Sequence, residues 1–293
     1  MQCFRLVIAP ALCSAITLLL IAATSPAAEK YEVEVKSAVE YGTGGGEKLL
    51  LELATPKGAK GPRPGVIFIH GGGWSGGNRM VHRGQAKEAA QRGYVAVSIG
   101  YRLAPKHVFP AQIEDCKCAV RWMRANAEKL DLDTKRIGAV GMSAGAHLVM
   151  MLGAMDKEDG LEGKGGHAEF SSKVQAVVSF AGPTDLTADY PPASRQIVAR
   201  FIGGTRKEKP GQRKLASPIT YVNKGDAPML LFQGTTDRLV PWQQAVSMAE
   251  ALTKAGVSGR VELLPGLGHG LSREEFSRTS AAMWVFLAKE LAN

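Results

Sequence analysis

Ser143 lies at the centre of Gly141-Met-Ser-Ala-Gly145, where a glycine stands two positions away on either side. A short apolar run, 137–140, precedes this segment, and a helix-favouring run, 146–152, follows it. A strand, a tight turn and a helix in this order expose the serine hydroxyl beside the N–H groups of the helix N-terminus. The glycines are needed because a Cβ at either position would meet neighbouring backbone. The segment predicts a nucleophilic serine, if the chain also supplies an oxyanion-binding loop, an acid and a base.

Three glycines, Gly71–Gly73, directly follow the apolar run 65–70, which reads as a buried strand. Without side chains, their backbone N–H groups are free to turn toward a developing negative charge. We expect Gly72 and Gly73 to supply two donors, and Ala144, the residue after the serine, to supply a third. The alternative is a plain glycine turn after a strand. The downstream serine segment favours the oxyanion-binding loop.

The acid is expected just beyond the carboxyl end of a strand in the second half of the chain. Asp237 follows the apolar run 227–234, and Asp185 follows the previous run, 174–181. A carboxylate in such a position fixes the tautomer of a histidine base and stabilises the imidazolium that forms. We assign the acid to Asp237, and we expect Asp185 to order the segment that follows it.

His269 is the predicted base, because it lies between glycines on a loop that follows the apolar run 260–264. It would take the serine proton and return it to the leaving group. His70 is expected to stabilise the glycine loop. The remaining histidines are expected off the carboxyl edge (His82 and His107), on the helix after the serine (His147) and in a polar loop (His167). Ser143, Asp237 and His269 then occur in the chain order nucleophile, acid, base.

The pattern of the chain around these residues alternates between apolar runs and amphipathic segments. Such alternation predicts an α/β fold with a mostly parallel, doubly wound sheet. A hairpin of strands precedes it, a turn is expected at 131–135, and a closing helix is expected at 272–291. The alternation weakens over about 183–226, after the sixth strand. The length suits a single catalytic domain, 28–293.

Four segments together carry a resemblance to a known family: His70-Gly-Gly-Gly-Trp74, Tyr101-Arg-Leu-Ala-Pro105, Phe109-Pro-Ala-Gln-Ile-Glu-Asp115 and Gly141-Met-Ser-Ala-Gly145. In this order they resemble the α/β-hydrolase esterases, above all the hormone-sensitive-lipase-like carboxylesterases and the bacterial feruloyl and acetylxylan esterases. The resemblance extends over residues 31–293. One departure is Ala146, where these families often have a second glycine, and a methyl group is tolerated at a helical position.

The resemblance implies the α/β-hydrolase fold, with residues 183–226 as a short cap over the active site. It also supports Asp237 as the acid, since Asp-Arg-Leu-Val-Pro after this strand matches the family pattern. The implied activity is hydrolysis of carboxylic esters through an acyl-enzyme, without a cofactor or a metal. Because the cap would shape the substrate pocket, the resemblance is much more specific for the reaction than for the substrate.

The expected substrate is a small acyl group, acetyl or feruloyl, on a plant polysaccharide. A general short-chain carboxylesterase or lipase-like enzyme is the main alternative. A peptidase with the same triad normally carries a large propeller domain, for which this chain has no room. A non-catalytic glycan-binding protein is disfavoured because every catalytic position holds a suitable residue. The sequence leaves the oligomeric state open.

The first 27 residues differ from the rest of the chain. Arg5 precedes the apolar stretch 6–23, and Ser25-Pro-Ala27 resembles a cleavage site. This pattern predicts a secretory signal peptide over 1–27 and a secreted or periplasmic protein with no membrane span after cleavage. The alternative is an uncleaved N-terminal anchor.

Charge and cysteine content exclude some partners. The net charge of +9 comes from scattered residues without interleaved aromatic side chains, so nucleic acid is not an expected partner. Cys116 and Cys118 lie two apart on a predicted helix and would point to different faces, so they are not expected to form a disulfide with each other.

Overall fold

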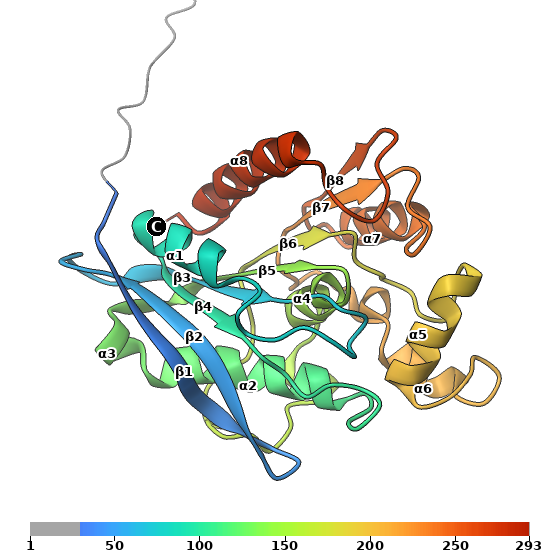
Figure 1. Cartoon of the computed structure of the whole chain (residues 1–293), viewed down its shortest axis with the longest axis horizontal. Helices are drawn as coiled ribbons and strands as arrows, with labels where there is room; N and C mark the ends of the chain where they lie inside the picture. Colours follow the sequence, from blue (N-terminus) through green and yellow to red (C-terminus); the bar gives the residue numbers. More distant parts are fainter. Residues whose placement is uncertain (1–29, 293) are drawn as a thin grey trace, which may run out of the picture.

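A computed structural model describes residues 30–292 as an eight-stranded sheet with helices on both faces (Figure 1). The sheet has the order β1-β2-β4-β3-β5-β6-β7-β8. Pairing is antiparallel between β1 and β2 and between β2 and β4, and parallel elsewhere. The strands are β1 (Val33–Gly44), β2 (Glu47–Pro56), β3 (Arg63–Ile69), β4 (Val95–Ile99), β5 (Leu132–Met142), β6 (Ala176–Phe180), β7 (Met229–Gly234) and β8 (Gly259–Leu264). The predicted fold class is confirmed.

The helices connect the parallel strands. They are α1 (Arg83–Gln91), α2 (Ala111–Ala125), α3 (Ala127–Leu130), α4 (Ala144–Ala154), α5 (Pro192–Ile202), α6 (Pro210–Leu215), α7 (Gln243–Lys254) and α8 (Arg273–Glu290), with short 3₁₀ turns η1 (Lys157–Asp159) and η2 (Pro218–Tyr221). Helix α5, helix α6 and η2 occupy the predicted cap segment, residues 183–226, between β6 and β7. None of the helices within residues 30–292 combines the length and the apolar character needed to span a bilayer.

The central strands are buried on both faces and divide the core into two layers. In β3, Ile67 and Ile69 belong to the layer that includes α2, α4 and α7, whereas Val66 and Phe68 belong to the layer that includes α1 and α8. This is why β3 reads as a continuous apolar run rather than an alternating one. The carboxyl ends of β3, β5 and β7 therefore open at one edge of a rigid sheet.

The structure corrects one predicted boundary and confirms the prediction about the two cysteines. The expected turn at 131–135 is wrong, because β5 already begins at Leu132, which pairs with Arg63 of β3. Cys116 and Cys118 are buried free thiols on α2, so the prediction that they do not bridge each other is confirmed. The predicted signal peptide, residues 1–27, lies outside the described residues.

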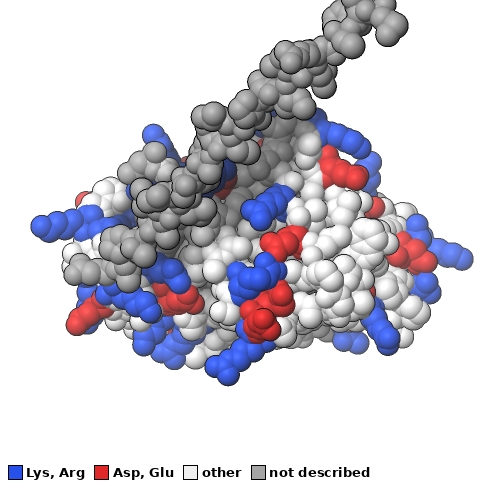
Figure 2. Space-filling view, turned by 90° about the horizontal axis from the view of Figure 1, so that it is seen from above, with Lys and Arg blue, Asp and Glu red and all other residues white. Residues whose placement is uncertain are grey.

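Surface charge follows the expected scatter. On the part of the surface visible in Figure 2, Lys and Arg side chains are interspersed with Asp and Glu rather than gathered in one basic patch. Long-range attraction of a polyanion such as nucleic acid requires a concentrated positive surface, which this face does not present.

Candidate active site

Ser143 occupies the turn between β5 and α4 in a backbone conformation that residues other than glycine rarely adopt, with φ 55° and ψ −120°. The turn is fixed on both sides. The Ser143 N–H donates to the Phe180 carbonyl at 2.7 Å, and the Ser143 carbonyl accepts from the His147 N–H at 3.0 Å. Backbone in a sparsely populated region persists where the surroundings impose it, and such residues cluster at functional sites. The turn holds the hydroxyl at the carboxyl edge of the sheet.

The glycines of this turn are required, as the sequence predicts. A Cβ on Gly145 would lie 2.7 Å from the His70 carbonyl oxygen and still closer to that of Ile69. A Cβ on Gly141 would lie 2.7 Å from the Ala146 nitrogen. These neighbours are backbone atoms at the end of β3 and in α4, so they cannot move aside as a flexible side chain can.

We expect Gly145→Ala to lower the free energy of unfolding by at least about 3 kcal/mol, because it forces the nucleophile turn away from β3. Gly84→Ala in α1 is the matched control, since a Cβ there meets nothing within 4 Å. Alanine lowers the conformational entropy of the unfolded chain relative to glycine, so Gly84→Ala should raise the free energy of unfolding by about 0.5 to 1 kcal/mol. Urea unfolding of both variants measures the difference, and equal midpoints for the two would contradict the steric argument.

The three predicted catalytic residues form one hydrogen-bonded relay. The Ser143 Oγ lies 2.8 Å from His269 Nε2, and His269 Nδ1 lies 2.8 Å from Asp237 Oδ2. In the productive tautomer, Nδ1–H donates to Asp237 and Nε2 accepts from the serine hydroxyl. The Asp237 side chain is fully buried, whereas that of His269 is 23% exposed. The structure thus brings together the residues that the sequence analysis selected.

Asp237 is held as a carboxylate by several donors. Its Oδ1 accepts the N–H groups of Leu239 at 2.8 Å and Val240 at 3.0 Å. Burial raises the pKa of Asp237, but the hydrogen bonds from His269 and from these N–H groups outweigh it, and the net pKa is lowered. Gln233, at the end of β7, donates from Nε2 to Asp237 Oδ2 at 2.9 Å and to the Val240 carbonyl at 3.0 Å.

The sequence analysis missed Gln233 as a positioning residue. Its signal was available, since a lone amide interrupts a buried apolar strand four residues before the acid. Asp185, the rejected candidate acid, instead accepts from the backbone N–H of Thr187 at 2.8 Å and from its hydroxyl at 2.6 Å. Its predicted role in ordering the following segment is confirmed.

The glycine loop after β3 presents N–H groups beside Ser143. Gly72 and Gly73 both have positive φ, at 107° and 57°. A Cβ on Gly71 would lie 2.8 Å from the Met142 carbonyl oxygen, so the loop packs directly on the nucleophile turn. Within residues 30–292, the N–H groups of Gly72, Gly73 and Ala144 donate to no protein acceptor. They are therefore available to an oxyanion.

His70 supports this loop, as predicted, and does not reach the relay. Its Nδ1 lies 2.7 Å from the Gly71 carbonyl oxygen, and its ring stacks on Tyr101 with centroids 4.3 Å apart. The Tyr101 hydroxyl donates to the His70 carbonyl at 3.0 Å. This contact explains one role of the Tyr101-Arg-Leu-Ala-Pro105 segment, which follows the neighbouring strand β4.

His147, one turn beyond the nucleophile, links the glycine loop to the cap. Its Nδ1 accepts from Trp74 Nε1 at 3.3 Å, and its Nε2 donates to the Ala216 carbonyl at 2.6 Å. Trp74 in turn stacks on Phe201 of α5, with centroids 4.1 Å apart. These bonds require neutral His147 because the ring must donate at one nitrogen and accept at the other. Its burial lowers the pKa to about 4.

We expect His147 to make the fold sensitive to acid. In the unfolded chain, histidine binds a proton below about pH 6.5, whereas folded His147 stays neutral down to about pH 4. Between these values the unfolded state binds more protons, so the free energy of unfolding decreases as the pH falls, by up to about 3 kcal/mol. His147→Phe should reduce the stability difference between pH 7 and pH 4.5, measured by urea unfolding. An unchanged difference would contradict this assignment.

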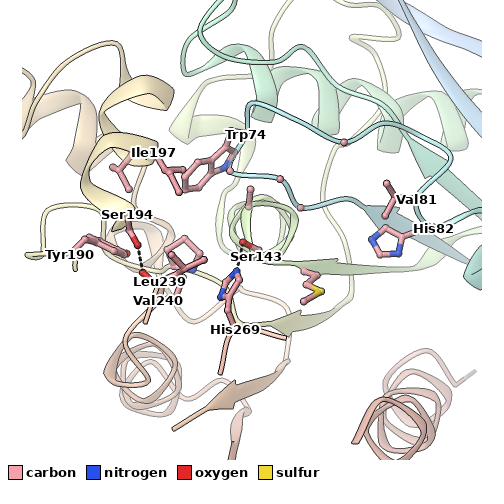
Figure 3. A pocket seen from close by; sticks show the side chains of 18 residues that line it. Trp74, Val81, His82, Ser143, Tyr190, Ser194, Ile197, Leu239, Val240 and His269 are labelled. Carbon is pink, nitrogen blue, oxygen red and sulfur yellow. Dashed lines mark hydrogen bonds between the residues drawn. The ribbon is translucent and has the colours of Figure 1, made fainter. Parts of the chain in front are cut away.

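The relay opens into a cavity of about 480 Å³ (Figure 3). Its walls are mostly apolar, and the cap contributes Tyr190, Ser194 and Ile197. The Ser194 hydroxyl donates to the Leu239 carbonyl at 2.6 Å, which ties α5 to the loop that carries the acid. The cavity therefore lies between the cap and the carboxyl edge of the sheet. His82 also lines it, so the expectation that His82 lies off this edge is wrong.

The BD-FAE family model matches residues 51–252 of the chain. Esterase LipC of Mycobacterium tuberculosis is 34% identical over 226 residues, which cover 74% of this chain and 55% of LipC. The chain spans about half the length of esterase LipC and of two other curated relatives that it matches.

Two solved structures share the fold over nearly their full lengths. A truncated form of a carbohydrate esterase from gut microbiota has a TM-score of 0.78 and 27% identity, covering 92% of this chain and 99% of that one. Esterase 2 of Thermogutta terrifontis, phosphorylated by paraoxon, has a TM-score of 0.73 and 28% identity, covering 88% and 94%. The chain belongs to the BD-FAE family and has the α/β-hydrolase fold.

Proposed function

We propose that the protein is a serine hydrolase that removes small acyl groups, acetyl or feruloyl, from plant polysaccharide outside the cytoplasm. The observation that carries the reaction is the relay from Ser143 through His269 to Asp237. Ser143 and His269 line one cavity together with the glycine loop, whose N–H groups at Gly72 and Gly73 donate to no acceptor within residues 30–292. The carbohydrate esterase among the structural neighbours supports the polysaccharide substrate. The signal-peptide pattern of residues 1–27 supports export.

The reaction follows from this arrangement in two steps. Ser143 Oγ attacks the ester carbonyl carbon while His269 Nε2 takes the hydroxyl proton, and the carbonyl oxygen becomes an oxyanion that Gly72, Gly73 and Ala144 bind. The C–O bond to the alcohol then breaks, and His269 returns the proton to the departing alcohol. Water, deprotonated by His269, attacks the acyl-enzyme and releases the acid and Ser143.

A general short-chain carboxylesterase is the second candidate. The apolar walls of the cavity favour this candidate, because Ile197 and Val240 have no side-chain group that could hydrogen-bond a sugar. The indole N–H of Trp74 is already donated to His147. On this alternative, acyl length would be set by the cavity, and the alcohol would be of little importance.

Release of acid from acetylated xylan, feruloylated xylan and 4-nitrophenyl acetate distinguishes the candidates. Ser143-dependent activity on either polysaccharide supports the first, and activity confined to the nitrophenyl ester supports the second. Paraoxon offers an independent readout: the wild type should gain the mass of one phosphoryl adduct, and Ser143→Ala should not. The absence of both hydrolysis and adduct would overturn the proposed reaction.

A further inference from the structure

A buried glutamine of α7, Gln244, bonds to the first residues of the cap. Its Oε1 accepts the backbone N–H groups of Thr184 at 2.8 Å and Asp185 at 2.7 Å. The Thr184 hydroxyl lies 2.8 Å from the Gln244 carbonyl oxygen and 3.1 Å from Oε1. Because backbone N–H groups only donate, the side-chain atom that faces them is the amide oxygen and not the nitrogen. The contact is shielded from water, since Gln244 is buried and Thr184 has no exposed surface.

Tyr190 bonds to the same oxygen. Its hydroxyl lies 3.1 Å from Gln244 Oε1 and 3.1 Å from the Asp185 carbonyl oxygen. Burial raises the pKa of Tyr190, so its hydroxyl keeps the proton that it donates to these acceptors. Gln244 Oε1 therefore fixes both the backbone at the start of the cap and the hydroxyl end of the Tyr190 ring.

The first segment of the cap has no other hydrogen-bonded anchor. Among residues 30–292, every hydrogen bond that joins residues 183–190 to the chain outside the cap ends on Gln244. Helix α5 has an anchor of its own, because the Ser194 hydroxyl donates to the Leu239 carbonyl. Loss of the Gln244 contact would therefore loosen the first segment of the cap without detaching α5.

The ring of Tyr190 is part of the wall of the catalytic cavity, as is Pro183, which directly precedes Thr184. In Figure 3, Tyr190 lies on the opposite side of Ser143 from Val81. The ring therefore belongs to the end of the cavity under the cap, and an ester arm that extends from Ser143 in this direction meets it. Since the hydroxyl is already bonded, the ring presents apolar surface to that arm.

We propose that Gln244 is a positioning residue for substrate selection, because its side-chain oxygen holds Tyr190 as the wall that limits how far an ester arm extends under the cap. The inference rests on the proposed esterase function. Within residues 30–292, Gln244 makes no hydrogen bond to the catalytic relay, and it acts on the substrate through the position of Tyr190. Its loss therefore changes the preference among esters, since a wall that is no longer held gives more room to a long arm, whereas a short arm does not need it.

The first test is Gln244→Met, which removes the acceptor and keeps the size of the side chain. Two pairs of esters vary one arm at a time: 4-nitrophenyl acetate and hexanoate vary the acyl arm, and ethyl and hexyl acetate vary the alcohol arm. We expect Gln244→Met to raise kcat/KM for the long ester relative to the short one at least about five-fold in one pair, mainly through a lower KM for the long ester. The pair that responds identifies the arm that lies under the cap.

Two further variants are the controls. Gln243→Met makes the same change at the neighbouring, exposed position and should keep the wild-type ratio. Gln244→Glu keeps an oxygen acceptor for the N–H groups of Thr184 and Asp185 and should restore most of the wild-type ratio. The inference is overturned if neither ratio rises in Gln244→Met, or if Gln243→Met or Gln244→Glu shifts a ratio as much as Gln244→Met does.

A milder variant, Tyr190→Phe, tests the same bond if Gln244→Met does not fold. It removes only the hydroxyl and leaves Gln244 Oε1 with the N–H groups of Thr184 and Asp185. We expect Tyr190→Phe to raise the long-to-short ratio of kcat/KM about two-fold in one of the two pairs. Ratios equal to those of the wild type would show that this bond does not hold the wall, and would overturn the inference.

The outcomes separate this inference from the proposed function. If the wild type shows no Ser143-dependent hydrolysis of any of the four esters, the esterase function fails, and the inference fails with it. If the esters are hydrolysed but the ratios are unchanged in Gln244→Met and Tyr190→Phe, only the role of Gln244 is overturned.

Discussion

We expect Ser143→Ala to lower kcat for ester hydrolysis by about four to six orders of magnitude. Ser143 Oγ is the atom that the relay deprotonates, since it lies 2.8 Å from His269 Nε2, and Ser143 lines the same cavity as the glycine loop. Without the hydroxyl, no acyl-enzyme forms. The remaining rate over uncatalysed hydrolysis comes from the oxyanion donors and from substrate binding.

The measurement is kcat for 4-nitrophenyl acetate, with Ser277→Ala on the exposed surface of α8 as the control. Ser143 has a backbone φ of 55°, and alanine also carries a Cβ, so the backbone strain stays nearly the same in Ser143→Ala. The melting temperature should therefore change little. If kcat of Ser143→Ala stayed within about two-fold of the wild type, the proposed mechanism would be overturned. A two-fold change corresponds to about 0.5 kcal/mol, which a surface substitution remote from the site also produces.

The residues of the relay were predictable because each follows a strand whose apolar run is visible in the sequence. Parallel strands end at one edge, so Ser143 after β5, Asp237 after β7 and His269 after β8 must converge there. Chain order permits both Asp185 and Asp237, and the match of Asp-Arg-Leu-Val-Pro to the family pattern selects Asp237. The choice therefore needs local patterns, one topological rule and the family resemblance.

The residues that sequence reasoning misplaced or missed depend on contacts between distant segments. Leu132 is the one apolar residue in the polar stretch 131–136. β5 begins at Leu132 because this residue pairs with Arg63 of β3. His82 reaches the cavity through the path of the loop after β3, which no local pattern encodes. His147 is satisfied by Trp74 and by the Ala216 carbonyl, 73 and 69 residues away. Such partners are set by tertiary packing, which periodicity does not reveal.

Asp237→Asn should lower kcat by about 10⁴-fold with little effect on stability, because it changes the tautomer of His269 rather than its position. The side-chain oxygen of an asparagine would stay with the N–H groups of Leu239 and Val240, since the reverse orientation would set its NH₂ against two backbone donors. Its NH₂ would then face His269 Nδ1 and donate to it. The proton of the neutral ring moves to Nε2, which can no longer accept from Ser143.

Asp185→Asn is the matched control, because it makes the same chemical change at the acid after β6. Among residues 30–292, Asp185 Oδ1 accepts only from Thr187 within the cap, so kcat should stay within about two-fold of the wild type. Both variants are compared by kcat on 4-nitrophenyl acetate at pH 7. A large loss of kcat in Asp185→Asn, together with a small loss in Asp237→Asn, would identify Asp185, after β6, as the catalytic acid. The hydrogen bond from Gln233 to Asp237 argues against that outcome, because it adds a further donor to a carboxylate that already accepts from His269 and from two backbone N–H groups.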